Sequence, residues 1–284
     1  MVYPQFITFV LLAIIFGTLN RLLNKYVLKE TDPYAFALMT QIISSIIFLP
    51  IAIINFSLPK SIEAYIVLAI ASLLWALVSF STYKSYKGTE VSIRDPLNQS
   101  KLIWTLILGI LLLGELVTSN RIIGTVIMFI GISLLMWHPE RKFGRFSDPG
   151  VKWTIGAAIL SATVAIADKL SLRWFKPEVY GFLVYLFPML ILLAFLPKRS
   201  HHIRHLFKIR GKSAVITIFI ATITYYFTLK AFSLADITLV YPLIQLSTLL
   251  TVIGGITLMK EKEHLWQRII ATIIIITGSI ILSI

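Results

Sequence analysis

Apolar stretches, each about as long as a membrane-spanning helix, follow one another along almost the whole chain. A hydrocarbon core of about 30 Å needs roughly 20 helical residues, and ten segments reach this length when polar interruptions within them are allowed. The pattern therefore predicts an all-α integral membrane protein with ten transmembrane helices, near residues 5–24, 34–54, 63–83, 91–113, 119–137, 153–172, 178–196, 213–230, 237–259 and 265–284. Most connections are short, which leaves little chain for a domain outside the membrane.

The pattern of the fourth predicted helix returns in the ninth. Residues 90–115 (EVSIRDPLNQSKLIWTLILGILLLGE) superpose on residues 236–261 (DITLVYPLIQLSTLLTVIGGITLMKE) with a constant shift of 146. The residue types that recur at this shift include Pro96 and Pro242, Gln99 and Gln245, and Glu115 and Glu261. The first hairpins also match, with a shift of 144 that places Asn24 on Asp168 and Pro33 on Pro177. Two copies of one unit are therefore present.

Each copy contains five predicted helices, and this odd number sets the topology. A second copy that follows through a short linker must enter the membrane from the opposite side, so the two five-helix repeats should have inverted topology. We predict a first repeat at 1–138, a linker loop at 139–150 and a second repeat at 151–284.

Composition agrees with a membrane protein and narrows the partners. With 57% hydrophobic and 14% charged residues and a mean hydropathy of +0.87, the chain has more apolar surface than one soluble core can bury. The net charge of +13 could indicate nucleic acid, but the loops after odd-numbered helices hold 18 Lys and Arg residues and the other loops hold 6. This asymmetry marks cytoplasmic loops. We expect a prokaryotic cell (inner) membrane with both chain ends outside, and no nucleic-acid partner.

The fourth predicted helix is unusual because its first half is charged. Arg94, Asn98 and Lys101 fall on one narrow stripe of the helix, and Gln99 lies on the neighbouring stripe. Lys101 then lies roughly 12–15 Å inside the membrane, where a charge facing lipid costs at least about 2.5–3.5 kcal/mol. We predict that these side chains face a water-filled cavity, and an internal salt bridge is the alternative.

Other side chains could line the same cavity. Aromatic rings beside polar groups suit a small organic solute, and the residues of this kind are Asn20, Trp75, Tyr225, Tyr226, Tyr241 and Gln245. Ordinary helix packing is the alternative for the aromatic residues. Pro96 and Pro242 each remove a backbone donor inside a helix; broken helices of this kind line transport sites, and a packing kink is an equal alternative.

A glutamate closes the fourth predicted helix of each repeat. Glu115 and Glu261 stand where these helices turn into the next, and Arg121 and Arg268 follow them. We therefore expect ion pairs that hold the turns, a structural role.

The GE pair at Gly114–Glu115 and the KE pair at Lys260–Glu261, together with ten predicted helices in two halves, resemble the EamA family of the drug/metabolite transporter superfamily. The resemblance covers essentially the whole chain. It implies a basket of helices around a central cavity, which the first, third, fourth, sixth, eighth and ninth helices would form.

Proton coupling of the kind used by related small multidrug carriers is not expected. In those carriers, to which the resemblance extends, a glutamate of the first helix couples transport to protons. The first predicted helix of this chain contains no acidic residue. Asp168 and Lys169, at the end of the sixth helix, are expected to pair or to reach the membrane surface rather than to couple protons.

These observations predict a secondary transporter that moves a small organic solute by alternating access. Arg94 and Lys101 would hold a carboxylate, as in an amino acid or similar metabolite, while Asn98, Gln99 and Gln245 would supply hydrogen bonds. A lipophilic-cation or drug exporter is the alternative, and a non-transporting membrane scaffold is a further one. The acids are too few for an enzyme, and without cysteine no thiolate metal site is possible. No cofactor or metal is expected, and the pattern leaves the oligomeric state open.

Overall fold

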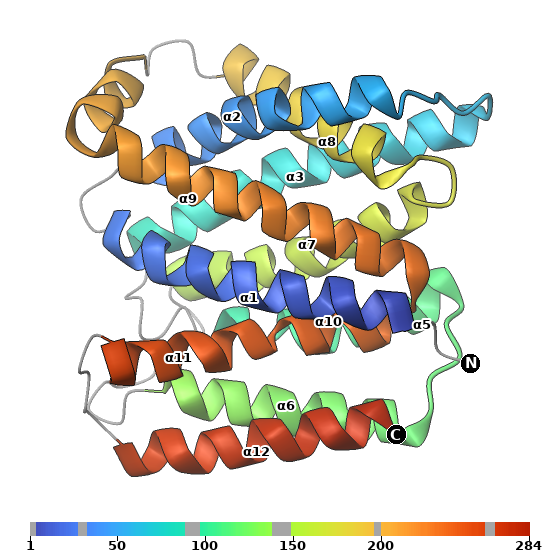
Figure 1. The fold of residues 1–284 in the computed structure, drawn as a ribbon, viewed down its shortest axis with the longest axis vertical. Coiled ribbons are helices and arrows are strands. Elements are labelled where there is room, and N and C mark those ends of the chain that lie inside the picture. Colours follow the sequence, from blue (N-terminus) through green and yellow to red (C-terminus); the bar gives the residue numbers. More distant parts are fainter. Residues whose placement is uncertain (1–3, 28–32, 89–96, 138–148, 196–199, 259–264) are drawn as a thin grey trace. The chain divides into compact units, whose positions relative to one another are not determined.

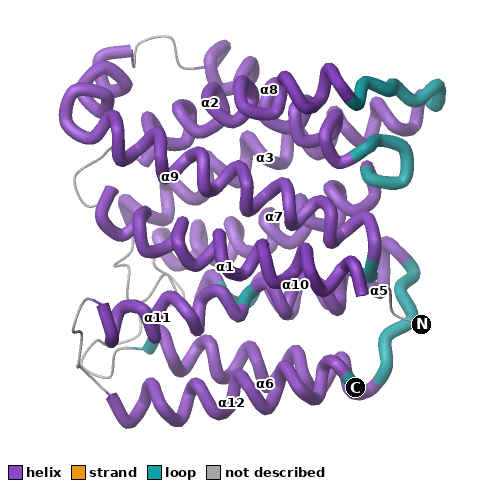
Figure 2. Tube along the Cα trace, in the orientation of Figure 1, coloured by secondary structure: helices purple, strands orange, loops and turns teal. Residues whose placement is uncertain are grey.

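The computed structural model describes residues 4–27, 33–88, 97–137, 149–195, 200–258 and 265–284. Within these ranges the chain is helical with short turns, and Figure 2 draws no strand in them. The helices, labelled in Figure 1, are α1 (Pro4–Val27), α2 (Pro33–Ile54), α3 (Ile62–Gly88), α5 (Lys101–Leu113), α6 (Ser119–Met136), α7 (Pro149–Ser171), α8 (Pro177–Phe195), α9 (Ser200–Leu234), α10 (Ile237–Ile244), α11 (Leu246–Leu258) and α12 (Leu265–Ser283). The predicted all-α class is confirmed.

Six of these helices are long and apolar enough to cross a membrane: α1, α2, α3, α7, α8 and α9. They coincide with the predicted first, second, third, sixth, seventh and eighth spans. Shorter apolar helices occupy the other four spans, and their crossing of the membrane stays a prediction. Among these six helices the largest difference from the predicted bounds is in α9, which begins at Ser200 rather than near residue 213. The intervening sequence has no proline or glycine before Gly211 that would end a helix.

The described chain forms two compact units, each of which takes helices from both sequence repeats. Unit 1 contains residues Met1–Phe80 and Ala167–Leu234, and unit 2 contains Ser81–Ile166 and Ala235–Ile284. The division falls inside α3 and α7. Each unit is described by itself below.

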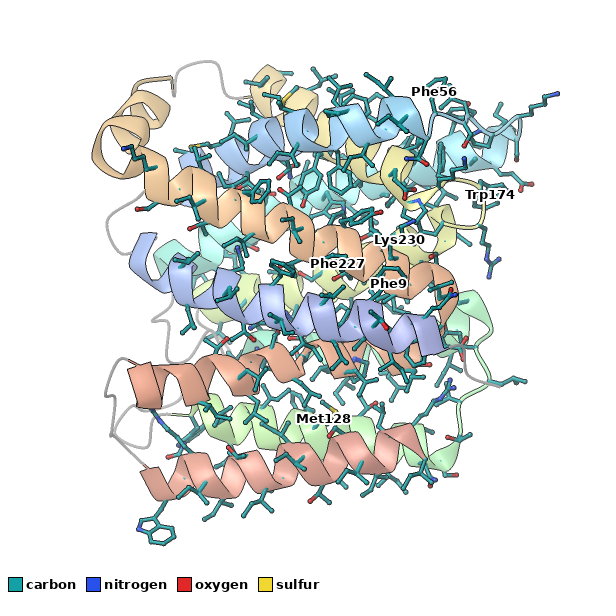
Figure 3. All side chains as sticks on the ribbon, viewed as in Figure 1. Phe9, Phe56, Met128, Trp174, Phe227 and Lys230 are labelled. Atoms are coloured by element: carbon teal, nitrogen blue, oxygen red, sulfur yellow. The ribbon has the colours of Figure 1, made fainter. Side chains whose placement is uncertain are left out.

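In unit 1, aromatic side chains pack the helices together in antiparallel pairs. The ring of Phe227 on α9 stacks on Phe9 and Phe16 of α1, with centroid distances of 6.2 and 5.7 Å, and Figure 3 labels Phe9 and Phe227. On α2, the Phe48 ring lies 5.8 Å from the Tyr185 ring of α8. Because α2 and α8 are counterparts in the two repeats, their contact joins the repeats within this unit.

In unit 2, α6 and α12 form the corresponding antiparallel pair. Gly124, near the start of α6, lies against Leu282 at the end of α12, and Gly131 lies against Ile275. At the other end, the Gln267 side-chain amide donates to two carbonyls at the end of α6, with N–O distances of 2.6 Å. Small residues allow this close approach, and Figure 3 labels Met128 on α6. Since α6 and α12 are repeat counterparts, their opposite directions are those that inverted repeats require.

Candidate functional site

The predicted ninth span is interrupted inside unit 2. Helix α10 ends at Ile244 and α11 begins at Leu246, so Gln245 lies at the break. Pro242, within α10, has no N–H for a helical hydrogen bond. The backbone N–H of Gln245 donates to the Pro242 carbonyl at 3.0 Å, and the backbone N–H of Thr248 donates to the backbone carbonyl of Gln245 at 2.9 Å. The Gln245 backbone N–H also donates to the Tyr241 carbonyl at 3.3 Å, so three-residue turns mix with the regular helical hydrogen bonds at the break.

The predicted fourth span is interrupted at the corresponding position. Gln99 and Ser100 form a turn, and α5 begins at Lys101. The Ser100 amide donates to the Leu97 carbonyl at 3.1 Å, and the Leu102 amide donates to the Gln99 carbonyl at 3.0 Å. Gln99 is the repeat counterpart of Gln245, so both helices break at equivalent residues. Pro96 and Arg94 lie outside the described residues.

Several predicted solute-binding residues lie beside these breaks. Gln99 and Gln245 are buried, whereas Asn98, Lys101 and Tyr241 are half-buried. Tyr241 packs against the apolar cluster of unit 2. Their binding role stays a prediction.

Two buried hydroxyl groups at the breaks have unused hydrogen-bonding capacity. Among the described residues, the Ser100 Oγ and Thr248 Oγ1 atoms have no partner. Ser100 is also the N-cap residue of α5, and its side chain makes no capping hydrogen bond. Buried polar atoms of this kind are rare in folded proteins and need an explanation, such as a ligand or water.

Glu115 performs a different task from the one expected. Its carboxylate accepts hydrogen bonds from the backbone amides of Ile237 (2.8 Å) and Thr238 (3.0 Å) and from the Thr238 hydroxyl (2.7 Å), so it caps the start of α10. Gly114, with φ 68°, provides the left-handed residue after α5 at which the chain turns. The expected pair of Glu115 with Arg121 is wrong, because Arg121 pairs with Asp236 at 2.7 Å. Glu261 lies outside the described residues.

In unit 1, Asp168 is the centre of a buried polar cluster. Its Oδ1 atom accepts hydrogen bonds from the Tyr180 hydroxyl (2.6 Å) and the Trp75 indole N–H (3.2 Å), and its Oδ2 atom accepts one from the Tyr225 hydroxyl (2.9 Å). Asp168 is only 2% exposed. The expected pair with Lys169 is wrong, because Lys169 donates to the Phe232 carbonyl at 2.6 Å.

Aromatic rings enclose this carboxylate. The Tyr225 ring lies edge-on to Trp75, with centroids 5.7 Å apart, and to Tyr185, with centroids 5.3 Å apart. Trp75 and Tyr225 were predicted to bind the solute, whereas Tyr180 and Tyr185 of α8 were not identified. In the sequence, these two tyrosines stand in an apolar helix. The same pattern is found in helices whose tyrosines only pack in a core, so it does not indicate a polar cluster.

A second polar group lies between α8 and α9. The Lys230 ammonium pairs with Glu178 at 2.6 Å, and the Tyr226 hydroxyl donates to the same carboxylate oxygen at 3.1 Å. The Lys230 ammonium also lies 5.6 Å from the centre of the Tyr226 ring, and Figure 3 labels Lys230. Elsewhere in unit 1, the Asn20 amide donates to the Thr217 carbonyl at 2.9 Å.

These features define a class of protein. Apolar spanning helices in two repeats, with antiparallel counterpart helices and with breaks at equivalent positions, are the architecture of a secondary membrane transporter. The sequence model of a family described as the EamA-like transporter family matches residues 5–137 and 148–284. The chain therefore belongs to the EamA-like transporter family, within the drug/metabolite transporter superfamily, whose members are transporters rather than enzymes.

Comparison with solved structures supports the fold alone. One structure, described only as "Crystal structure of protein", aligns with a TM-score of 0.75 over 98% of this chain and 96% of its own, at 14% sequence identity. A search of curated proteins gave no match.

Proposed function

We propose that this EamA-like transporter moves a small organic solute that carries a carboxylate, such as an amino acid, by alternating access. The observation that supports this substrate class is the start of α5. Lys101 occupies its first position, the hydroxyl of Ser100 before it is buried without a partner among the described residues, and a helix N-terminus favours negative charge. An ammonium group and a buried hydroxyl at the positive end of a helix together suit a carboxylate.

The broken helices support the transport mechanism. Interrupted helices in corresponding positions of two inverted repeats are typical of the solute and ion sites of secondary transporters. Such repeats can exchange conformations, which exposes the site to one side of the membrane and then to the other. Gln99 and Gln245, at the two breaks, would supply hydrogen bonds to the solute.

The test is uptake of a panel of radiolabelled amino acids and dicarboxylates into proteoliposomes. We expect Lys101→Ala to lower the flux of the transported solute at least tenfold, and Lys101→Arg, which keeps the charge, to retain part of it. Lys152→Ala, at an exposed lysine of α7, is the matched control and should leave the flux unchanged. Equal flux for Lys101→Ala and the wild type would remove Lys101 from the mechanism.

The buried Asp168 cluster favours a second candidate, an exporter of lipophilic cations. A carboxylate among Trp and Tyr rings suits an organic cation, because the ring faces attract positive charge. This candidate predicts that efflux of tetraphenylphosphonium persists in Lys101→Ala and is lost in Trp75→Ala. Failure of the wild-type protein to move any lipophilic cation would eliminate it.

A further inference from the structure

We propose that Asp168 is a proton-binding site, and that its carboxyl group takes up and releases a proton during the transport cycle. Proton binding by Asp168 is independent of the proposed function, and only its part in the transport cycle rests on that function. The coupling ion of the transporter would then be H⁺, bound in unit 1 by the cluster of Asp168, Trp75, Tyr180 and Tyr225.

The first argument is burial without a counter-ion. Asp168 is 2% exposed, and it forms no salt bridge within the part of the chain that the structure describes. The lysine next to it, Lys169, donates to the Phe232 carbonyl, and Lys230 pairs with Glu178. A buried charge without an opposite charge is expensive, whereas the neutral acid is not.

The second argument is the number of hydrogen bonds. Three donors stabilise the ionised form of Asp168, which offsets the penalty of burial. Burial favours the protonated carboxyl group, whereas the hydrogen bonds from Trp75, Tyr180 and Tyr225 favour the carboxylate. Because these opposing contributions act on the same group, both forms are accessible, as a site that binds and releases protons requires.

The third argument is the place where a proton would bind. An ionised carboxylate offers two acceptor sites on each oxygen. Tyr180 and Trp75 fill both sites of Oδ1, while Tyr225 fills one site of Oδ2. The fourth site, on Oδ2, is unused by the described residues, so the geometry points to Oδ2 as the atom that is protonated.

Tyr225 can adapt to either form, because a hydroxyl both donates and accepts. With the carboxylate, Tyr225 donates to Oδ2. After a proton from water forms the Oδ2–H bond, the new hydroxyl can donate to the Tyr225 oxygen, while the Tyr225 hydrogen turns away. The reverse steps return the proton to water. The Trp75 indole N–H can only donate, so it holds Oδ1 in both forms.

Protonation at this point would act on four helices. The donors to Asp168 come from α3, α8 and α9, and Asp168 itself is on α7. Among the described residues, the titratable groups beside Asp168 are the phenols of Tyr180, Tyr185 and Tyr225. The next charged groups are Lys169 on α7 and the Glu178–Lys230 pair of α8 and α9. A change of charge at one buried carboxyl group can therefore change the packing of all four helices.

Infrared spectroscopy tests proton binding without any solute. The purified protein in lipid nanodiscs is titrated with acid, and the C=O band of a protonated, buried carboxyl group is followed. We expect a titrating band in the wild type that Asp168→Asn lacks and Glu178→Gln retains. Tyr225→Phe should shift the midpoint of this band, which keeps the proposal testable if Asp168→Asn does not fold. The same titrating band in wild type and Asp168→Asn, or no band in the wild type, would overturn the proposal.

Coupling is tested separately in proteoliposomes, with the radiolabelled solute of the panel that shows the highest flux. A pH gradient should drive accumulation in the wild type and not in Asp168→Asn, whose downhill flux should no longer depend on pH. If no solute of the panel is transported, the proposed function fails while the infrared result still decides proton binding. Accumulation driven by a sodium gradient alone would assign the coupling to another ion and overturn the second half of the proposal.

Discussion

Replacing Glu115 should loosen the start of α10, the helix that leads to the break at Gln245. The Glu115 carboxylate accepts three hydrogen bonds, from the amides of Ile237 and Thr238 and from the Thr238 hydroxyl. In Glu115→Ala these three donors lose their acceptor. In Glu115→Gln one amide oxygen remains, but the negative charge beside the N-terminus of α10 is lost.

The magnitude follows from two kinds of contribution. Loss of a helix cap costs about 0.5–2 kcal/mol, and a hydrogen bond to a charged group contributes about 1.5–3 kcal/mol. The contributions of bonds to one carboxylate are not additive. We therefore expect Glu115→Ala to lower the free energy of unfolding by about 2–4 kcal/mol, and Glu115→Gln by about 1–2 kcal/mol.

Reversible unfolding in mixed detergent and SDS micelles, followed by tryptophan fluorescence, measures these changes. Glu63→Ala is the matched control, because Glu63 is an exposed acid in the first turn of α3 and its loss should change stability by less than about 0.5 kcal/mol. A double-mutant cycle with Thr238→Val should give a coupling of about 0.5–3 kcal/mol. The same stability for Glu115→Ala and Glu63→Ala would refute the capping role.

Two further predictions use the same unfolding assay. A Cβ atom at Gly181 would lie 2.3 Å from Cε1 of the buried Phe48 ring, whereas a Cβ atom at Gly156 would have no neighbour within 4 Å. Gly181→Ala should therefore lower the free energy of unfolding by about 1–3 kcal/mol. Gly156→Ala should raise it by about 0.5–1 kcal/mol. Equal effects would refute the close contact. The side chains of Arg121 and Asp236 are 22% and 45% exposed, so Arg121→Ala should cost less than about 1 kcal/mol, and a larger loss would contradict this estimate.

The fold was largely predictable because its signals are local or repetitive. Long apolar stretches predict helices without any knowledge of their partners, and six of these helices are long enough to cross the membrane. The 146-residue shift aligns Gln99 with Gln245 from the sequence alone, and both predicted spans are interrupted at these residues. The extent of α9 was missed because hydropathy marks only the part of a helix that lies within lipid.

The partners of the charged residues could not be predicted in this way. The donors to Asp168 lie 93, 12 and 57 residues away in the sequence, whereas the predicted partner was its neighbour Lys169. Arg121 follows Glu115 closely, yet its partner Asp236 is 115 residues away. Opposite charges that are close in the sequence suggest a pair, but the packing of the helices brings residues from distant parts of the chain closer and so selects the partner.

The difference between the two repeats suggests how scaffold and chemistry are divided. Residues shared by both copies, such as Gln99 and Gln245, lie where the backbone breaks, and inverted repeats need the same break in each copy if they are to exchange conformations. The charged candidates are not shared: Lys101 corresponds to Ser247, and Asp168 corresponds to Asn24. A charge repeated in both copies would place two like charges in the membrane, where each is expensive. A single copy of Lys101 and of Asp168 therefore has a lower cost in stability than a copy in each repeat, which is compatible with the binding roles proposed for them.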